Sequence, residues 1–366
     1  MNILQKIAAR TKERVDARRT VLPLRELMEM INARNAPAGV HCKASADCPR
    51  NALTGFPFEK ALRSEDIAFI CEVKRASPSK GIIANEFPYL DIAKDYEAAG
   101  AAAVSVLTEP FYFKGDDDHL REIANTVSIP LLRKDFTVDR YMIYEAKLLG
   151  ASAVLLICSL LERETLEEFI YIAHGLGLSA LVETHSEAEV DMALTTGARI
   201  IGANNRNLET FEVDIALSGR LKKMVPPDIV FVSESGIRTA DDVEILRQNG
   251  VDAVLVGETL MRSPDKKAAL AELRDGNKAA PAELRGGNKS APAKLRGGNK
   301  TAPVELRDDN KAASVELRGG YKAAPAELRG GNKAALAELR GGNKTASAEL
   351  RGGNKTASVE LRGDAE

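Results

Sequence analysis

Two charged residues at the end of one apolar segment, Glu72 and Lys74, are the first sign of chemistry in this sequence. They close the apolar run 68–71, and the chain then breaks into Ser-Pro-Ser-Lys-Gly, a pattern typical of a buried strand that opens into a loop. Residues two apart on a strand point to the same side, so the carboxylate and the ammonium are expected to lie together. Such a pair is either a buried ion pair or part of an active site, and the pair alone does not decide between them.

Charged residues also close three later apolar segments, as Lys134, Glu183 and Glu234. With Glu72 and Lys74 they make two lysines and three carboxylates, a set that suits proton transfer. Burial and mutual charge can lower the pKa of Lys and raise that of Glu toward neutrality, and we expect this tuning here. Each residue alone is more typical of a charged rim, whereas five at the ends of apolar segments favour an active site.

The apolar segments that would position these charges alternate with amphipathic stretches between residues 68 and 260. Strands are expected at 68–74, 103–107, 131–135, 153–157, 180–183, 200–204, 230–234 and 253–257, and helices at 90–99, 140–149, 160–174, 188–195 and 241–249. Nearly continuous apolar strands that alternate with helices indicate an α/β protein with a parallel sheet covered by helices. Eight of them in roughly 200 residues predict a closed (β/α)₈ TIM barrel. An open doubly wound sheet would be expected to carry GxGxxG after its first strand, and this chain does not.

In such a barrel the active site lies at the carboxyl ends of the strands and in the loops that follow. Ser235, Gly236 and Gly257 follow the last two strands, where these barrels offer backbone N–H groups to a phosphate, although Ser235-Gly236 also suits an ordinary turn. Phe113 and Phe136 either stack on an aromatic ligand or cover the barrel. Further candidates near strand ends are Ser77, Pro78, Asn204, Arg206 and Glu258.

Helical segments precede the barrel and a repetitive tail follows it. Apolar spacing predicts two helices within residues 1–34, separated at Pro23, then a loop over 35–55 and a short helix at 58–62. From Ala271 the unit Ala-Glu-Leu-Arg-Gly-Gly-Asn-Lys-Ala-Ala-Pro recurs every 11 residues. Each unit has one large apolar residue beside Gly or Pro, so a disordered tail is expected, with an interaction or assembly tail as the alternative. The predicted domains are a barrel with its N-terminal extension at 1–274 and the tail at 275–366.

The composition argues against several other classes of protein. The 366 residues carry a formal net charge of −2, which disfavours a global binder of nucleic acid or of anionic membranes. No apolar stretch approaches the roughly 20 residues of a membrane span, and the amphipathic start lacks the pattern of a signal peptide, so a cytoplasmic protein is expected. The cysteines lack a CxxC spacing and are expected to be free thiols. His41, Cys42 and Cys48 lack a fourth ligand at a familiar spacing, so no metal site is predicted there.

Seven motifs, in order along residues 1 to about 270, resemble the indole-3-glycerol phosphate synthase family of tryptophan biosynthesis. They are EVKRASPSKG (72–81), LTEPFYFKG (107–115), LRKDF (132–136), LVETH (181–185), IGANNRNL (201–208), SESGI (233–237) and VGETLM (256–261). The resemblance implies a carboxy-lyase that closes the ring of 1-(2-carboxyphenylamino)-1-deoxyribulose 5-phosphate, with loss of CO₂ and water, to give indole-3-glycerol phosphate. It implies no metal, redox or other cofactor, and the tail from 275 has no part in it.

The resemblance also implies roles for the strand-end residues. Lys134 would protonate the ketone oxygen during ring closure, Lys74 would meet the substrate carboxylate and assist loss of the hydroxyl, and Glu183 would be the base of the dehydration. How the two lysines share the acid roles stays open. Glu72, Asn204 and Ser235 would position the hydroxyls and lysines, and Glu234 would complete the polar floor. Ser77, Gly236, Gly257 and the backbone at Glu258 would bind phosphate; Phe113, Phe136, Leu155, Pro78 and Leu208 would line the anthranilate pocket; and Arg206 is a further expected substrate contact.

The sequence leaves two other functions open. Another phosphate-binding barrel, such as a sugar-phosphate isomerase, would need a different acid–base pair after strands one and seven. A non-enzymatic scaffold that displays the repeats would not need the intact strand-end motifs. The family resemblance favours a monomer that binds a small phosphorylated substrate, without a nucleic-acid or membrane partner, and whose N-terminal helix covers the barrel mouth. No partner of the tail is predicted.

Overall fold

The structure of this chain, a computed structural model, describes residues 2–35, 55–207 and 210–276, together with the backbone of eight short strands between 284 and 362. The chain separates into two units, Met1–Leu273 and Arg274–Glu366, and each is described here by itself. Leu208, His41, Cys42 and Cys48, which the sequence singled out, lie outside the described residues. Among the described residues, Cys71 and Cys158 are buried and form no disulfide, as predicted. Within the described residues, no helix is long and apolar enough to cross a membrane.

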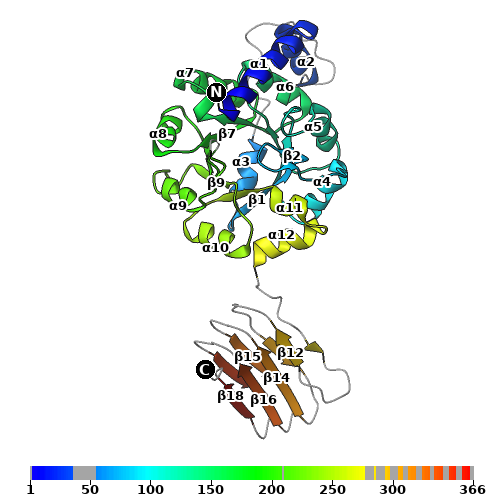
Figure 1. Cartoon of the computed structure of the whole chain (residues 1–366), viewed down its shortest axis with the longest axis vertical. Helices are drawn as coiled ribbons and strands as arrows, with labels where there is room; N and C mark the ends of the chain where they lie inside the picture. The colour runs from blue at the N-terminus through cyan, green and yellow to red at the C-terminus, as the bar shows by residue number, and fades with distance from the viewer. Residues whose placement is uncertain are drawn as a thin grey trace. The chain divides into compact units, whose positions relative to one another are not determined.

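Parallel strands close into a barrel at the centre of the first unit, which confirms the predicted fold (Figure 1). Its closed order is β1-β10-β9-β8-β7-β6-β5-β4. The strands are β1 (Ala68–Val73), β4 (Ala103–Leu107), β5 (Leu131–Lys134), β6 (Ala153–Ile157), β7 (Ser179–Thr184), β8 (Ile200–Asn204), β9 (Val230–Glu234) and β10 (Ala253–Val256). A small antiparallel pair, β2 (Ala76–Ser77) with β3 (Gly81–Ile82), follows β1 and was not predicted, because strands of two residues leave no periodic pattern.

Helices surround the barrel and alternate with its strands. They are α4 (Tyr89–Ala98), α5 (Asp117–Ala124), α6 (Arg140–Leu149), α7 (Arg163–Gly175), α8 (Glu187–Thr195), α9 (Ala216–Lys222), α10 (Ala240–Gln248), α11 (Glu258–Arg262) and α12 (Lys266–Asp275), with the 3₁₀ helix η2 (Cys158–Leu160) before α7. At Gly150, the C-cap of α6, φ is 95°, a left-handed conformation that glycine adopts without steric cost. The sequence did not predict α5, α9 or α11, which are each eight residues or shorter.

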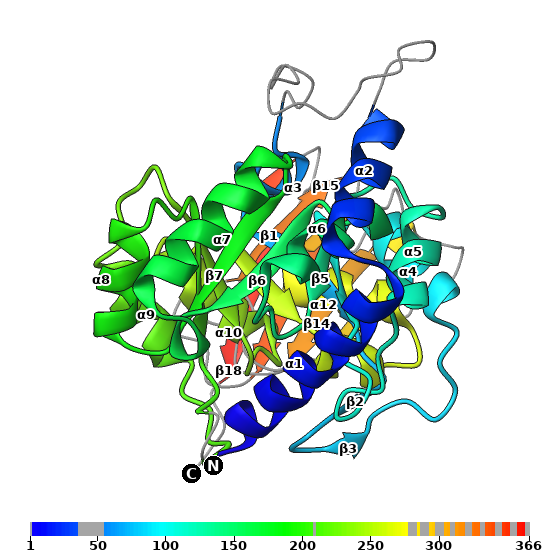
Figure 2. The ribbon, with the colours of Figure 1, turned by 90° about the horizontal axis from the view of Figure 1, so that it is seen from above.

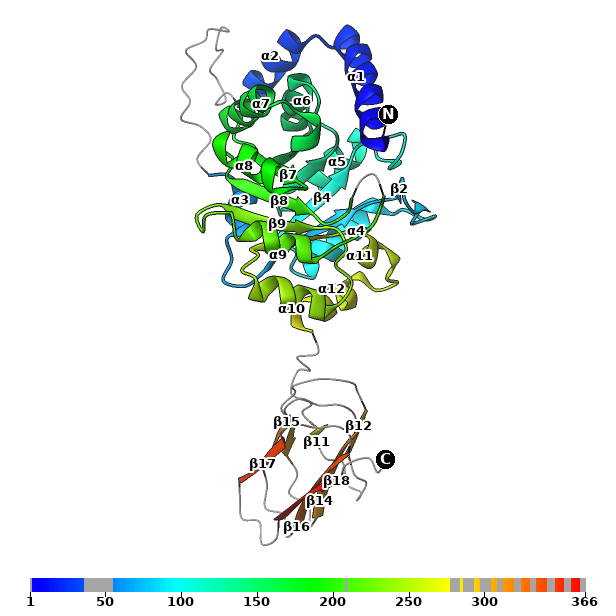
Figure 3. The same ribbon diagram turned by 60° about the vertical axis from the view of Figure 1, so that its left-hand side comes forward.

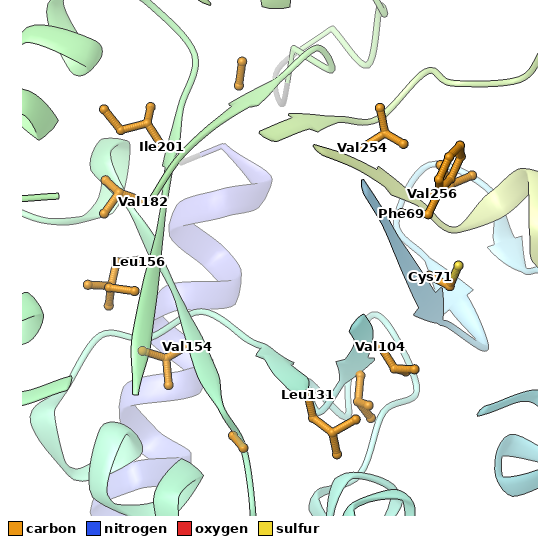
Figure 4. Close-up of a cluster of buried hydrophobic side chains, with 14 of the residues drawn as sticks. Phe69, Cys71, Val104, Leu131, Val154, Leu156, Val182, Ile201, Val254 and Val256 are labelled. Atoms are coloured by element: carbon orange, nitrogen blue, oxygen red, sulfur yellow. The ribbon is translucent and has the colours of Figure 1, made fainter. Parts of the chain in front are cut away.

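Strand residues alternate between two apolar layers. Odd positions of β1 such as Phe69 and Cys71 face outward and pack with Val104, Leu131 and Val154 under the helices (Figure 4). Inward positions fill the barrel itself, including Ile70, Leu132, Leu155, Leu181, Val232 and Leu255. Phe58 and Leu62 of α3 (Pro57–Leu62) are part of this inner layer. The next inward position after Ile70, Leu132, Leu181 and Val232 is a charged residue, and these charged residues form the site described below.

The N-terminal segment forms two helices, α1 (Ile3–Val21) and α2 (Leu24–Asn35), which confirm the predicted break at Pro23. Asn2 and Gln5 cap the start of α1 reciprocally, which satisfies backbone N–H groups that would otherwise lack partners. Val15, Leu27 and Ile31 pack against Tyr141 and Met142 of α6. Figure 2 shows α1 running diagonally in front of the barrel strands, and Figure 3 shows α2 beside α6. The apolar stripe of this helix pair therefore fastens the extension to one side of the barrel.

The second unit contains one short strand in each of eight repeats: β11 (Leu284–Arg285), β12 (Ala293–Arg296), β13 (Val304–Arg307), β14 (Ala312–Arg318), β15 (Ala324–Arg329), β16 (Ala334–Arg340), β17 (Ala346–Arg351) and β18 (Ala357–Arg362). Alternate strands pair in parallel, in the orders β11-β13-β15-β17 and β12-β14-β16-β18. Leu328 pairs with Leu350 and Leu339 with Leu361, so equivalent residues of alternate repeats share a register. The expected disorder of the tail stays a prediction. Amide hydrogen exchange would test it, because fast exchange throughout the tail is expected for a disordered segment and slow exchange would contradict disorder.

Candidate active site

A cavity of about 300 Å³ lies at the carboxyl ends of the barrel strands. Side chains from every barrel strand or the loop after it line this cavity, and helix α1 contributes Ile3, Leu4 and Ile7. Every site residue predicted from the sequence lines this cavity except Leu208. They are Glu72, Lys74, Ser77, Pro78, Phe113, Lys134, Phe136, Leu155, Glu183, Asn204, Arg206, Glu234, Ser235, Gly236, Gly257 and Glu258. Motifs that are far apart in the sequence thus meet at one place.

Lys134 lies between two carboxylates inside the cavity. Its Nζ is 3.3 Å from Oε2 of Glu183 on β7 and 3.4 Å from Oε2 of Glu234 on β9. Lys74 forms an ion pair with Glu72 across the expected two-residue spacing. The ion pair that the sequence left open is therefore formed, and both of its members line the cavity; an active-site role for the pair stays a prediction.

The pKa values of this cluster follow the expectation from the sequence only in part: that of Glu234 is raised toward neutrality, but that of Lys134 is not lowered. Burial alone would lower the pKa of Lys134, but the carboxylates of Glu234, Glu183 and Glu72 outweigh burial and raise the pKa above its ordinary value. The expectation of a lysine tuned down toward neutrality is therefore wrong for Lys134. With three carboxylates nearby, the ammonium is the favoured form, and Lys134 is a fully charged hydrogen-bond donor at neutral pH.

The two glutamates beside Lys134 differ in pKa. For Glu183, burial raises the pKa, but Lys134, His185 and a hydrogen bond from Asn204 Nδ2 (3.2 Å) together lower it below the ordinary value. For Glu234, burial and the nearby Glu183 and Glu72 outweigh the Lys134 ammonium and raise the pKa to about 7. Glu183 is thus the ionised member of the pair, and Glu234 is the member that holds a proton more easily.

The Glu234 side chain occupies space that a glycine on the next strand leaves open. A Cβ added to Gly202 of β8 would lie 2.4 Å from Oε1 of Glu234, so no larger residue fits there without displacing the carboxylate. That same Oε1 is buried and lacks a hydrogen-bond partner. The arrangement favours a proton on Glu234, because a neutral carboxyl costs less to bury than a carboxylate.

Replacing Glu234 by Gln is expected to stabilise the fold above pH 7. The folded pKa of Glu234 is raised from 4.5 to about 7, so its favourable contribution is present at low pH and is lost as pH rises through about 7. At pH 8 the neutral glutamine side chain should raise the free energy of unfolding by on the order of 1–3 kcal/mol, and at pH 5 the difference should vanish. Urea unfolding at the two pH values checks this, with the exposed Glu26→Gln as control. Equal effects at both pH values would contradict the assignment.

A left-handed pair of residues, Ser235 and Gly236, follows β9. Their φ values are 67° and 87°, and successive residues of this kind can turn backbone N–H groups toward an anion. Asn205 holds the turn, since its Nδ2 donates to Ser235 O and to Ser233 Oγ, each at 3.0 Å. A Cβ at Gly236 would lie 2.4 Å from Val213 Cγ1, so glycine is required by conformation and by space. This geometry suits the predicted phosphate-binding role.

Arginines at the same end of the cavity were missed by the sequence reasoning. Arg238 and Arg262 line the cavity near the Ser235-Gly236 turn and the start of α11. Arg262 Nε donates to Oε1 of Glu258 at 3.0 Å. Arg238 lies four residues beyond the end of β9 and Arg262 is the last residue of α11, so neither directly follows a strand. Cations at these two positions add positive charge where an anionic group would bind.

Two aromatic rings form the opposite wall of the cavity. Phe113 and Phe136 lie with ring centroids 5.9 Å apart at an angle of 41°. The carboxylate of Glu109 fixes the loop that carries Phe113, because it accepts hydrogen bonds from the backbone N–H groups of Phe111, Tyr112 and Phe113 at 2.9, 2.7 and 3.0 Å. A buried carboxylate that holds three amides gives this loop one defined shape, and the wall fits a flat aromatic group.

Helix α1 is tied to the barrel directly beside Lys134. Arg14 Nη2 donates to both carboxylate oxygens of Asp135 at 2.8 Å, and Asp135 also accepts from Thr108 Oγ1 at 2.6 Å. Burial would raise the pKa of Asp135, but Arg14 and Arg133 outweigh burial and lower it. Sequence reasoning missed this link, since Arg14 and Asp135 are 121 residues apart and neither residue stands out alone.

The fold and this site together define a class of protein, a (β/α)₈-barrel enzyme whose cavity at the carboxyl ends of the strands holds a charged cluster, a left-handed turn and an aromatic wall. Comparison with known proteins specifies the family. The family model for indole-3-glycerol phosphate synthase matches residues 4–273, and the chain belongs to this family. The match covers the first unit and leaves the repeats outside.

Relatives that carry the name indole-3-glycerol phosphate synthase support this membership. The protein of Ruminiclostridium cellulolyticum is 57% identical over 272 residues, which are 74% of this chain and 98% of the relative. The one from Endomicrobium trichonymphae is 56% identical over 60% of this chain and 84% of its own. The protein of Lachnoclostridium phytofermentans is 47% identical over 74% of this chain and 98% of its own. The resemblance predicted from seven short motifs is confirmed.

Proposed function

We propose that the cavity at the strand ends carries out the indole-3-glycerol phosphate synthase reaction of tryptophan biosynthesis, a carboxy-lyase activity on a phosphorylated small molecule. Membership of the family supports the activity. The observation that carries the assignment of the site is the position of Lys134. A charged ammonium held between Glu183 and Glu234, with the Lys74–Glu72 pair in the same cavity, supplies an acid, a base and a cation for a carboxylate.

In ring closure, the aromatic carbon that bears the carboxylate attacks the ketone of the substrate. Lys134 donates a proton to the developing alkoxide, and its ammonium form, favoured by three nearby carboxylates, suits this step. The Lys74 ammonium faces the substrate carboxylate. Carbon dioxide then leaves, and the electrons of the broken bond restore the aromatic ring. The Phe113 and Phe136 rings contact the aromatic part of the substrate during this step.

In dehydration, the hydroxyl formed from the ketone leaves as water while the indole double bond forms. Lys74 gives the proton that the departing hydroxyl needs, and Glu183 removes a proton from the substrate as base. The lowered pKa of Glu183 keeps it ionised and ready to accept a proton. Glu72, Asn204 and Ser235 position the hydroxyls and the lysines. Ser77, Gly236, Gly257 and the backbone at Glu258 bind the phosphate, and Pro78, Leu155, Arg206 and Leu208 complete the substrate contacts.

The test is turnover of 1-(2-carboxyphenylamino)-1-deoxyribulose 5-phosphate by the purified full chain, followed by indole fluorescence. Activity is expected with no added cofactor and is expected to persist after treatment with EDTA. Absence of turnover by folded protein would refute the proposed function. Loss of activity on chelation, restored by a divalent metal, would refute the assignment of the chemistry to the lysines and glutamates alone.

Removing the tail is expected to leave this activity nearly unchanged. Truncation after residue 276 keeps α12 complete, including the buried Leu270 and Leu273 that close the first unit. The kcat/KM of residues 1–276 should stay within about twofold of the full chain, because the described residues that line the cavity end at Arg262 and the family match ends at residue 273. A tenfold loss would show that the repeats contribute to the enzyme. A cytoplasmic location, expected from the sequence pattern, and a monomeric state, expected from the family resemblance, stay predictions.

A further inference from the structure

The two carboxylate oxygens of Glu183 contact different groups, and only the contact with Lys134 is part of the proposed reaction. Its Oε2 accepts a hydrogen bond from Lys134 Nζ at 3.3 Å. The other oxygen, Oε1, accepts from Asn204 at 3.2 Å and lies 3.5 Å from Nε2 of His185. The Glu183 side chain is 2% exposed, so a proton taken from substrate needs a neighbour to carry it out of the cavity.

His185 connects Glu183 to a second carboxylate. Its Nδ1 lies 3.4 Å from Oε2 of Glu189, while Nε2 faces Glu183. Both ring nitrogens are buried and neither makes a hydrogen bond of good geometry. The His185 side chain is 18% exposed, yet both of its ring nitrogens are buried between the two carboxylates. This is unusual for a purely structural residue, because buried polar atoms are normally paired.

Glu189 is fixed in place at the start of α8. Its Oε2 accepts a hydrogen bond from the backbone N–H of His185 at 2.7 Å, and the helix begins at its N-cap Ser186. The side chain of Glu189 is 20% exposed, ten times the exposed fraction of Glu183. The three residues therefore form a path from the sealed base toward solvent.

A second cavity lies on the outer side of this path. It shares Leu4, Asn204 and Arg206 with the main cavity, and it is lined by His185 and Glu189. Its other lining residues are mostly polar, including Ser159, Asn205, Glu212 and Asp214. A polar cavity of this kind can hold water that receives protons from Glu189.

The charges that face His185 come from three elements, as Glu183 of β7, Glu189 of α8 and Glu234 of β9. Burial lowers the pKa of His185, but these carboxylates outweigh burial and raise it above the ordinary value. Cys158 of η2 lies near Glu189, with its Sγ 3.8 Å from the backbone O of that residue. Burial raises the pKa of the Cys158 thiol to about 12, so the thiol stays neutral. An imidazole in this field can take up and release protons within the pH range in which enzymes commonly work.

We propose that His185 is the proton exit of the dehydration step and acts through Glu183, an inference that rests on the proposed role of Glu183 as base. Glu183 takes a proton from the substrate and becomes a carboxylic acid. The neutral His185 imidazole, with its proton on Nδ1, accepts that proton at Nε2, so that Glu183 returns to the carboxylate. The resulting imidazolium releases its Nδ1 proton to Glu189, and exchange of the remaining ring proton with water restores the starting tautomer. Glu189 passes the proton to water in the second cavity. One proton enters this path and one leaves it per turnover.

Replacement of His185 by Ala, followed by addition of imidazole, tests the path. The variant is expected to lower kcat by about tenfold or more and to leave KM within about twofold, because substrate contacts are retained. Free imidazole can enter the space left beside the second cavity and should restore kcat in proportion to its unprotonated fraction. Glu189→Gln should lower kcat in the same direction. His174→Ala, at a half-buried histidine that packs on Phe56, is the control and should show no response to imidazole.

Two further variants keep the test decisive. His185→Gln fills the site if the alanine variant is unfolded by circular dichroism, and it should show the same loss of kcat without rescue. Wild-type kcat and pH profile in either folded variant would overturn the proposal, as would a loss in His185→Ala that imidazole fails to restore. Glu183→Gln distinguishes the proposed role of Glu183 from that of His185. An active Glu183→Gln variant would refute the role of Glu183 as base. An inactive Glu183→Gln variant together with a fully active His185→Ala variant would refute only the role of His185 as proton exit.

Discussion

Replacing Lys134 by Gln is expected to lower kcat by roughly 10³-fold, within the range that a general acid contributes. The variant keeps a polar side chain of similar length and removes only the proton and the charge. Lys134 lies within 3.4 Å of both Glu183 and Glu234, and loss of its charge also removes the influence that keeps Glu183 ionised. Both effects act on the chemical steps, so KM should change far less than kcat.

The same substitution should change how stability depends on pH. Without the ammonium, the buried carboxylates of Glu183 and Glu234 lose the cation that they share, and their pKa values rise. A carboxyl with a raised folded pKa stabilises the protein at low pH and loses that contribution as pH rises through it, so Lys134→Gln should be destabilised most above pH 7. Lys223→Gln, at an exposed lysine after α9, is the matched control. A variant with kcat within tenfold of the wild type would refute the role of Lys134 as acid.

Most of the barrel could be predicted because its strands combine two sequence features, a nearly continuous apolar run and a charged residue at the end of that run. The run 68–74 is apolar until its charged end, which indicates burial on both sides, and that charged end marks where the strand reaches solvent. β4, β6, β8 and β9 have the predicted bounds, and β1, β5, β7 and β10 differ by one residue at one or both ends. The short helices α5, α9 and α11 were missed because two turns of helix give too few residues for a period to be recognised.

The side-chain positions at the mouth follow from the same alternation. Once Ile70 and Leu132 face the barrel interior, Glu72 and Lys134 must face the cavity two residues later. The direction of the pKa change at Lys134 does not follow, because it depends on distances among Glu72, Glu183 and Glu234 that lie on three different strands. A one-dimensional sequence contains the residues of a cluster but not the balance between burial and charge.

Contacts from outside the strand ends were the other part that the sequence did not reveal. The apolar stripe of the N-terminal segment predicted a helix, but not that Ile3, Leu4 and Ile7 would line the cavity. His185 falls within a family motif, yet its placement between Glu183 and Glu189 depends on how the loop between β7 and α8 folds. Contacts of this kind form only when separate segments fold onto the same cavity. The structure is therefore needed to show which side chains reach the site.

Replacing Arg14 by Ala is expected to loosen the helix that covers the site and to destabilise the whole first unit. The Arg14 side chain is 9% exposed and its partner Asp135 is fully buried. The variant leaves this carboxylate with the Thr108 hydroxyl, the backbone N–H of Phe136 and the more distant Arg133, 3.8 Å away. Breaking such a buried pair should lower the free energy of unfolding by on the order of 3 kcal/mol at pH 7. Urea unfolding measures this loss directly.

The pH dependence of that loss identifies its cause. The folded pKa of Asp135 is lowered below 3.8, so its pairing stabilises the protein above that pH and is lost as pH falls through the folded value. The difference between wild type and Arg14→Ala should therefore shrink below about pH 4, where a protonated Asp135 no longer needs Arg14. Arg25→Ala, which removes an exposed pair with Glu29 on α2, should have no measurable effect at any pH.

The kinetic effect of Arg14→Ala should show whether helix α1 only covers the site or also takes part in the chemical steps. Helix α1 contributes only apolar side chains to the cavity, and these contact substrate and transition state alike, so a loosened α1 should raise KM by about tenfold and change kcat much less. A fall in kcat with unchanged KM would instead mean that the Arg14–Asp135 pair acts through the adjacent Lys134. Truncating Leu4 to Ala tests the same point independently, since it removes contact area and leaves the ion pair intact. If covering is the role of α1, both variants should show the same pattern, and only Arg14→Ala should show the pH-dependent loss of stability.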